Sequence, residues 1–139
     1  MIKQEVLASI DATWREFKST IESMTSNELC KSIDDDKKSV DQLLTHISRT
    51  ESNLTRILLG DTGLDDVIES SSSTVNRPIA QTITELDEVH RALRKTLGDA
   101  SETIFESGTK LRDSIDEATT FHYIEHRIEI LSLIDVIRQ

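Results

Sequence analysis

Histidine is the residue type in this chain with the clearest potential for chemistry, because a neutral imidazole nitrogen is a common metal ligand. The sequence has four histidines. His122 and His126 are four residues apart in a stretch with helical periodicity, so their rings share one face about 6 Å apart. Both rings can therefore reach one ion, with metal–nitrogen bonds of about 2.0–2.1 Å. By itself, this spacing is only a weak indication of a metal site. Two solvated histidines on a polar helix face are the better interpretation of the pair alone.

His46, at the edge of the apolar stripe of an earlier helix, changes this balance. Helical bundles build metal sites from side chains on facing helices. If the two helices are antiparallel, with the end near Leu59 beside the start near Ser114, His46 lies about 20 Å from that end. His122 and His126 then lie about 12–18 Å from it. If the two helices are parallel, His46 also lies at nearly the same height in the bundle as His122 and His126. A site made of these three residues therefore does not show whether the two helices are parallel or antiparallel.

The fourth histidine and the single cysteine are predicted to lie outside this site. His90 takes a stripe position between Leu86 and Leu93, where a lone histidine is more often a hydrogen-bonded core or rim residue than a ligand. Cys30 is the only cysteine, which excludes an internal disulfide and any multi-thiolate metal site. Because Cys30 sits in a polar stretch, we predict a plain free thiol.

Three neutral imidazoles would leave an ion its double charge and an open position, as in catalytic rather than structural sites. Such an ion lowers the pKa of a bound water or thiol, or polarises a carbonyl. Zinc, nickel, iron and copper all accept imidazole. Glu129, three residues beyond His126, is a candidate to orient a ligand histidine or act as a base. Thr50, four residues beyond His46, is a candidate to orient that ring. The ordinary alternatives are that Glu129 is a surface acid and that Thr50 is a packing residue.

Four stretches with helical periodicity must position these residues. They run from about Ile2 to Met24, from Ser39 to about Leu59, from Pro78 to about Gly98, and from about Ser114 to near the C-terminus. Ser39 with Gln42, and Ser114 with Glu117, have the form of capping boxes. With no strand alternation, one proline and four glycines, the chain is predicted to be all-α.

The link from Asp61 to Arg77 is long for neighbouring helices in a bundle. It has the length to carry the chain along the molecule, so the two helices that it joins are expected to run parallel. With no internal repeat and no second domain, we predict one four-helix bundle over residues 1–139. Apolar residues lie on more than one face of the last helix, which predicts either the most buried helix or a surface that pairs with another subunit. A homodimer is the expected assembly.

Composition narrows the classes of partner. Sixteen basic and 26 acidic residues give a formal net charge of −10, which argues against nucleic acids and anionic lipid surfaces. No apolar stretch approaches the ~20 residues of a membrane-spanning helix. The N-terminus lacks a basic leader and an apolar h-region, so a cytoplasmic location is the expectation.

The segment SVDQLLTHISRTESNLTRILLG, followed after the link by FHYIEHRIEILSLID, resembles the DinB/YfiT-like family of metal-dependent enzymes. TWREFKSTIESMTSNEL resembles the opening of that family, so the similarity spans nearly the whole chain. The resemblance implies an up-down-down-up bundle with a long connection between the second and third helices. It also places the three metal ligands of the family on His46, His122 and His126. Arg127 and Ile128 replace a small residue and a polar residue that relatives often have there.

The resemblance also implies a reaction class. Characterised members of the family use a low-molecular-weight thiol, such as bacillithiol or mycothiol, to transfer or isomerise small molecules. We therefore expect one divalent ion, zinc or nickel, and a thiol-dependent transferase or isomerase. Metal-assisted hydrolysis, a non-catalytic metal-binding or stress-related dimer, and a bundle without metal are the alternatives.

Overall fold

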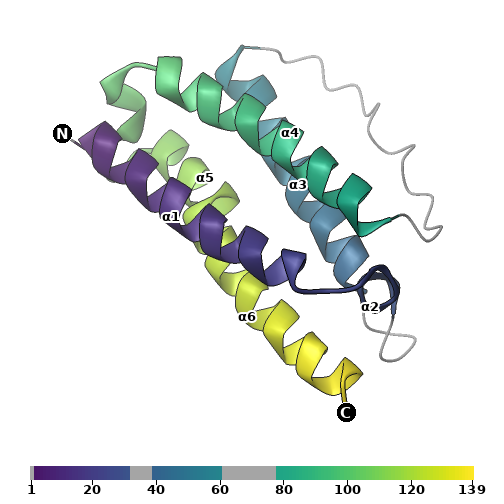
Figure 1. Cartoon of the computed structure of the whole chain (residues 1–139). Helices are drawn as coiled ribbons and strands as arrows, with labels where there is room; N and C mark the ends of the chain where they lie inside the picture. Colours follow the sequence, from purple (N-terminus) through teal and green to yellow (C-terminus); the bar gives the residue numbers. More distant parts are fainter. Residues whose placement is uncertain (1, 32–38, 61–77) are drawn as a thin grey trace.

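The computed structural model describes residues 2–31, 39–60 and 78–139 (Figure 1). These residues form α1 (Ile2–Glu22), α2 (Ser26–Cys30), α3 (Val40–Leu58), α4 (Ile79–Asp99), the 3-10 turn η2 (Glu102–Phe105), α5 (Lys110–Ala118) and α6 (Thr120–Ile137). No strand occurs in these three ranges, which confirms the predicted all-α class. The predicted link over residues 61–77 lies outside the described residues.

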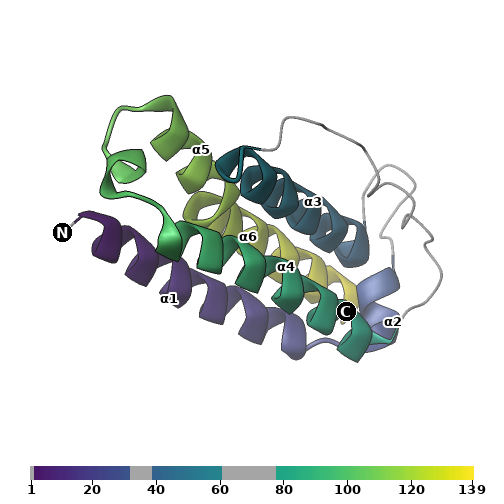
Figure 2. The same ribbon diagram turned by 90° about the horizontal axis from the view of Figure 1, so that it is seen from above.

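The four long helices, α1, α3, α4 and α6, form the bundle in the predicted up-down-down-up order (Figures 1 and 2). Between α1 and α4, Lys18 bonds Asp87 and Arg94 bonds Asp11, so these two helices are antiparallel. The start of α4 is tied to α2 by a 2.9 Å hydrogen bond from the Ile79 N–H to Ser26 Oγ. The helices α3 and α4 both begin at the end of the bundle where α2 lies, and they run parallel (Figures 1 and 2).

A single buried cluster fills the space between the long helices. The apolar stripe predicted for the first helix is buried in α1, and stripes of α3, α4 and α6 face it. Burial of one such large apolar side chain stabilises the fold by about 1.5–3 kcal/mol. The largest of the fully buried side chains are Tyr123, Phe17 and Phe105. These interlocking stripes set the rotation of each helix and hence the direction of the polar side chains described below.

Local capping explains where α3 begins. Ser39 Oγ accepts from the Gln42 N–H at 3.3 Å, and Gln42 Oε1 accepts from the Ser39 N–H at 2.8 Å. This reciprocal pair satisfies two amide donors that the helix start leaves free, as the capping box predicts. The start of α3 is confirmed.

The predicted start of the last helix at Ser114 is wrong. Ser114 lies inside α5, which begins after Thr109, whose Oγ1 accepts from the Arg112 N–H at 3.1 Å. A serine and a glutamate three residues apart also occur inside helices, so this pattern alone does not mark a helix start. Thr109, five residues earlier, is the residue that caps the helix. The helix is then interrupted at Thr119, where φ is −121° and ψ is −96°, and continues as α6.

The outer face of α6 carries exposed apolar side chains. Phe121, Ile124, Ile128 and Leu131 recur at spacings of three and four and are 43% to 63% exposed. The expectation that this is the most buried helix is therefore wrong, and the alternative, a homodimer that covers this face, stays a prediction. Neither α6 nor any other helix within the described residues has the length and apolarity to cross a membrane.

Candidate metal centre

Three imidazole rings face one another across the gap between α3 and α6. His46 comes from α3, and His122 and His126 come from successive turns of α6. One nitrogen from each ring lies within 4.8 Å of the others. Nε2 of His46 and Nε2 of His122 are 3.2 Å apart, close to the roughly 3.3 Å expected for two nitrogens on one tetrahedral ion. The structure therefore brings together the three residues singled out in the sequence.

The core holds the backbones that carry these rings. Ile47, next to His46, and Tyr123, next to His122, are completely buried. The rings themselves grade from the interior to the surface: His126 is 9% exposed, His122 is half-buried and His46 is exposed. The cluster thus sits on rigid helices but opens to solvent on the side of His46, which gives a small molecule access.

Glu129 orients one of the rings. Its Oε1 lies 2.8 Å from Nδ1 of His126, one turn earlier on α6. A carboxylate that accepts from Nδ1–H fixes the tautomer and leaves Nε2 to bind a metal. This contact favours the orienting role over the role of a base. Thr50 behaves differently, because its hydroxyl donates to the backbone carbonyl of His46 at 2.9 Å, rather than to the ring.

The electrostatics of the cluster keep His122 neutral. Its pKa falls from 6.5 to about 4, chiefly because burial disfavours the charged ring, and also because His126 and His46 lie beside it. At neutral pH the ring is therefore deprotonated, with a lone pair available. A metal ligand must be in this state, so the donor set suits a divalent ion.

His90 lies outside the cluster, in a buried polar group that it forms with Glu51 and Tyr123. Glu51 Oε1 accepts from the Tyr123 hydroxyl at 2.7 Å, and Nδ1 of His90 is 3.1 Å from the same oxygen. Burial and the charge of Glu51 raise the pKa of Tyr123 well above 10.0. The prediction of a hydrogen-bonded core histidine is confirmed.

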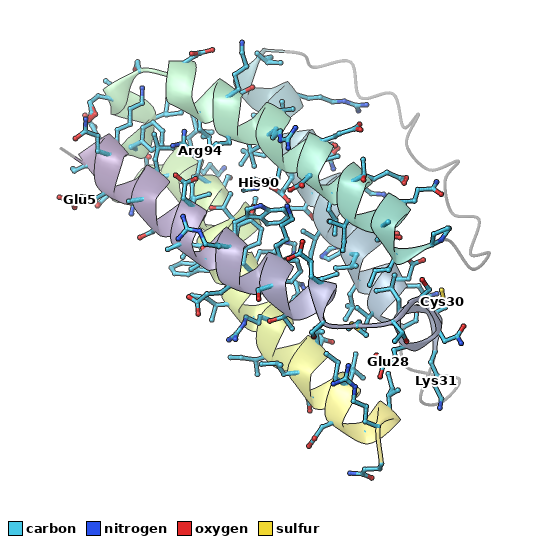
Figure 3. The ribbon with its side chains drawn as sticks, viewed as in Figure 1. Glu5, Glu28, Cys30, Lys31, His90 and Arg94 are labelled. Atoms are coloured by element: carbon cyan, nitrogen blue, oxygen red, sulfur yellow. The ribbon has the colours of Figure 1, made fainter. Side chains whose placement is uncertain are left out.

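Glu51 is a buried polar residue that was not among the residues predicted from the sequence. Its side chain is completely buried, although an acid is rarely so. The available signal was its position four residues after Ile47 and three before Leu54, on the inner stripe of α3. The thiol of Cys30 is free, as predicted, and lies at the end of α2 (Figure 3).

Comparisons with known proteins give a single, family-level result. No curated protein and no solved structure matches the chain. The family model of the DinB superfamily matches residues 9–128, a range that contains all three clustered histidines and reaches into each of the four long helices. With the bundle order and the histidine cluster in place, the conclusion is that the chain belongs to the DinB superfamily.

Proposed function

We propose that His46, His122 and His126 bind one divalent metal ion and that the protein is a metal-dependent enzyme acting on a small molecule. The observation that carries the proposal is the convergence of three ring nitrogens within 4.8 Å from two separate helices. Zinc and nickel are the proposed ions, because both accept imidazole nitrogen in a site without thiolates.

The side chains around the cluster support a catalytic rather than a purely structural site. Three ligands leave at least one position for a water or substrate, and the exposed side of His46 provides the approach. Glu129 holds His126 in one orientation, and burial keeps His122 unprotonated. When bound, the ion supplies Lewis acidity, which lowers the pKa of a thiol or water.

The reaction that we propose is thiol transfer or thiol-dependent isomerisation, on the strength of the family resemblance. In transfer, the sulfur of a low-molecular-weight thiol forms a bond to an electrophilic carbon, the leaving group departs with the bonding electron pair, and the thiol proton passes to solvent. In the first alternative, metal-dependent hydrolysis, water takes the place of the thiol. In the second alternative, the protein binds the metal but catalyses no reaction.

Metal content is the first test. Protein purified without a histidine tag should bind about one equivalent of zinc or nickel per chain in calorimetric titration, and elemental analysis should identify the ion carried from the cell. His122→Ala should lose this binding, because it removes the ring closest to His46. Glu125→Gln, an exposed neighbour on the same helix, is the matched control and should bind normally. Normal metal binding by His122→Ala would reject the site.

Activity is the second test. The metal-loaded protein should transfer a low-molecular-weight thiol onto an electrophilic substrate, and His46→Ala should abolish this turnover. Turnover with water in place of the thiol would point to the hydrolase alternative. Stoichiometric metal binding without turnover over a broad panel of thiols and electrophiles would reject the enzyme and leave the non-catalytic metal protein.

A further inference from the structure

A groove between α1 and α4 lies on the opposite side of the bundle from the histidine cluster. In the bundle α1 packs against α4 and α6, and α3 packs against α4 and α6. The groove between α1 and α4 is therefore opposite the gap between α3 and α6, where the histidines lie. The groove has a volume of 670 Å³. Figure 3 shows His90 and Arg94 extending from α4 into the space between the two helices.

The groove is positively charged, although the chain as a whole is acidic. Two aspartates, Asp11 and Asp99, line it together with five cations: Arg15, Lys18, Arg91, Arg94 and Lys95. The chain has 16 lysines and arginines and a formal net charge of −10, so this concentration of cations departs from the average surface. A local field of this sign attracts anions.

Two of the five cations are left without a partner. Lys18 pairs with Asp87, Arg94 pairs with Asp11, and Lys95 pairs with Asp99. Within the described part of the chain, Arg15 and Arg91 form neither an ion pair nor a side-chain hydrogen bond, and both are exposed.

The two unpaired arginines flank the same point of the groove. The contacts Lys18–Asp87 and Arg94–Asp11 fix the register of the antiparallel pair. In that register residues 14 and 15 of α1 lie opposite residues 90 and 91 of α4. Arg15 and Arg91 therefore stand on the two rims at the level of His90.

Trp14 and His90 line the groove at this level, with their rings stacked flat at a centroid distance of 4.0 Å and an angle of 8°. Nδ1 of His90 contacts Glu51 and Tyr123 in the core, whereas Nε2 has no hydrogen-bond partner among the described residues. The indole N–H of Trp14 has none either. Neither atom is sealed from solvent, and both residues line the groove.

We infer that this groove binds the phosphate group of a small molecule. Guanidinium groups bind phosphate oxygens in a bidentate manner, and Arg15 and Arg91 both line the groove. The indole N–H of Trp14 adds a third donor. Because the Tyr123 hydroxyl donates to Glu51, its oxygen and Glu51 Oε1 both accept from Nδ1 of His90, which leaves Nε2 as the polar atom of this ring without a protein partner among the described residues. A phosphate monoester has three terminal oxygens that can accept from the two guanidinium groups and the indole N–H together, whereas a carboxylate has only two.

Trp14 makes the test direct, because it is the only tryptophan of the chain and lines the groove. Inorganic phosphate is titrated into metal-free protein in the presence of a chelator, with sodium chloride adjusted to hold the ionic strength constant. We expect a saturable change in tryptophan fluorescence. In the Arg15→Gln/Arg91→Gln variant, the dissociation constant should rise at least tenfold.

A second double variant, Arg49→Gln/Lys110→Gln, removes the same charge from α3 and α5 and should bind phosphate as the native protein does. Circular dichroism should give both double variants native helix content, since the mutated side chains are exposed. Equal phosphate affinity in the groove variant, or a response that chloride reproduces, would overturn the site. Acetate binding as tight as phosphate would overturn the choice of phosphate. Because the titration uses metal-free protein, none of these outcomes tests the proposed metal site at the histidine cluster.

Discussion

Oε1 of Glu129 lies 2.8 Å from Nδ1 of His126, three residues earlier on α6. The glutamate side chain is half exposed, whereas that of His126 is 11% exposed, so the carboxylate reaches inward from the rim to a buried ring. A carboxylate on the far nitrogen of a ligand histidine fixes the ring orientation and raises its basicity. Glu129 is thus a positioning residue for the proposed ligand His126.

Glu129→Ala should weaken zinc or nickel binding by about 10- to 100-fold without changing the stoichiometry, because His126 loses its orienting partner. Competition with a chromophoric chelator measures this affinity. Glu125→Ala, on the same helix, should leave it unchanged. An affinity for Glu129→Ala equal to that of the native protein would show that the carboxylate does not support the ligand.

Metal should also raise the melting temperature of the native protein. A ligand that binds only the folded state stabilises it by about 2.7 kcal/mol at a free concentration of 100 times the dissociation constant. The shift should disappear in His46→Ala, since that variant leaves two histidines on one helix. Thermal unfolding followed by circular dichroism, with and without zinc, provides the measurement. A shift of native size in His46→Ala would contradict the three-residue site.

Removing the buried acceptor of the core should destabilise the fold. Glu51→Leu leaves the buried Tyr123 hydroxyl without its acceptor, at a cost of about 1–3 kcal/mol, whereas Nδ1 of His90 keeps its 2.9 Å contact with the Tyr123 oxygen. Glu51→Gln keeps an oxygen in that position and should cost less. Urea unfolding of both variants gives the comparison, and equal free energies of unfolding for Glu51→Leu and the native protein would show that the buried group is not stabilising.

The ion pair between α2 and the end of α6 should make stability depend on acidity. Arg138, in a bidentate contact, holds the pKa of Glu28 at about 2, below the 4.5 of an unperturbed glutamate. Because the folded state has the lower pKa, this stabilisation is present above pH 4.5 and is lost as the pH falls toward 2. Glu28→Gln should be less stable than the native protein at pH 7, and the difference should vanish near pH 2. Chemical denaturation across this range tests the trend, which a pH-independent difference would contradict.

Much of the bundle follows from local features of the sequence. The apolar stripes of α1, α3 and α4, and the capping box at Ser39, depend on residues at most a few turns apart, so periodicity and capping chemistry predict them. The length between the second and third helices predicts that they run parallel. The capping pattern gave the wrong residue at the start of α5. Both Thr109 and Ser114 are residue types that cap helices, and in the structure Thr109 is the cap.

Spacing also predicted that His122 and His126 lie on one face, because residues four apart on a helix share a face. Local patterns were therefore enough to predict the four long helices, their order along the chain and the pair His122 and His126. The contact of Glu129 with His126, the contact of Glu51 with His90 in the core, and the place of Arg15 and Arg91 along one groove could be seen only in the folded structure. Such pairings depend on how far each helix is rotated and shifted against its neighbours, and only the packing of the whole core sets those two quantities.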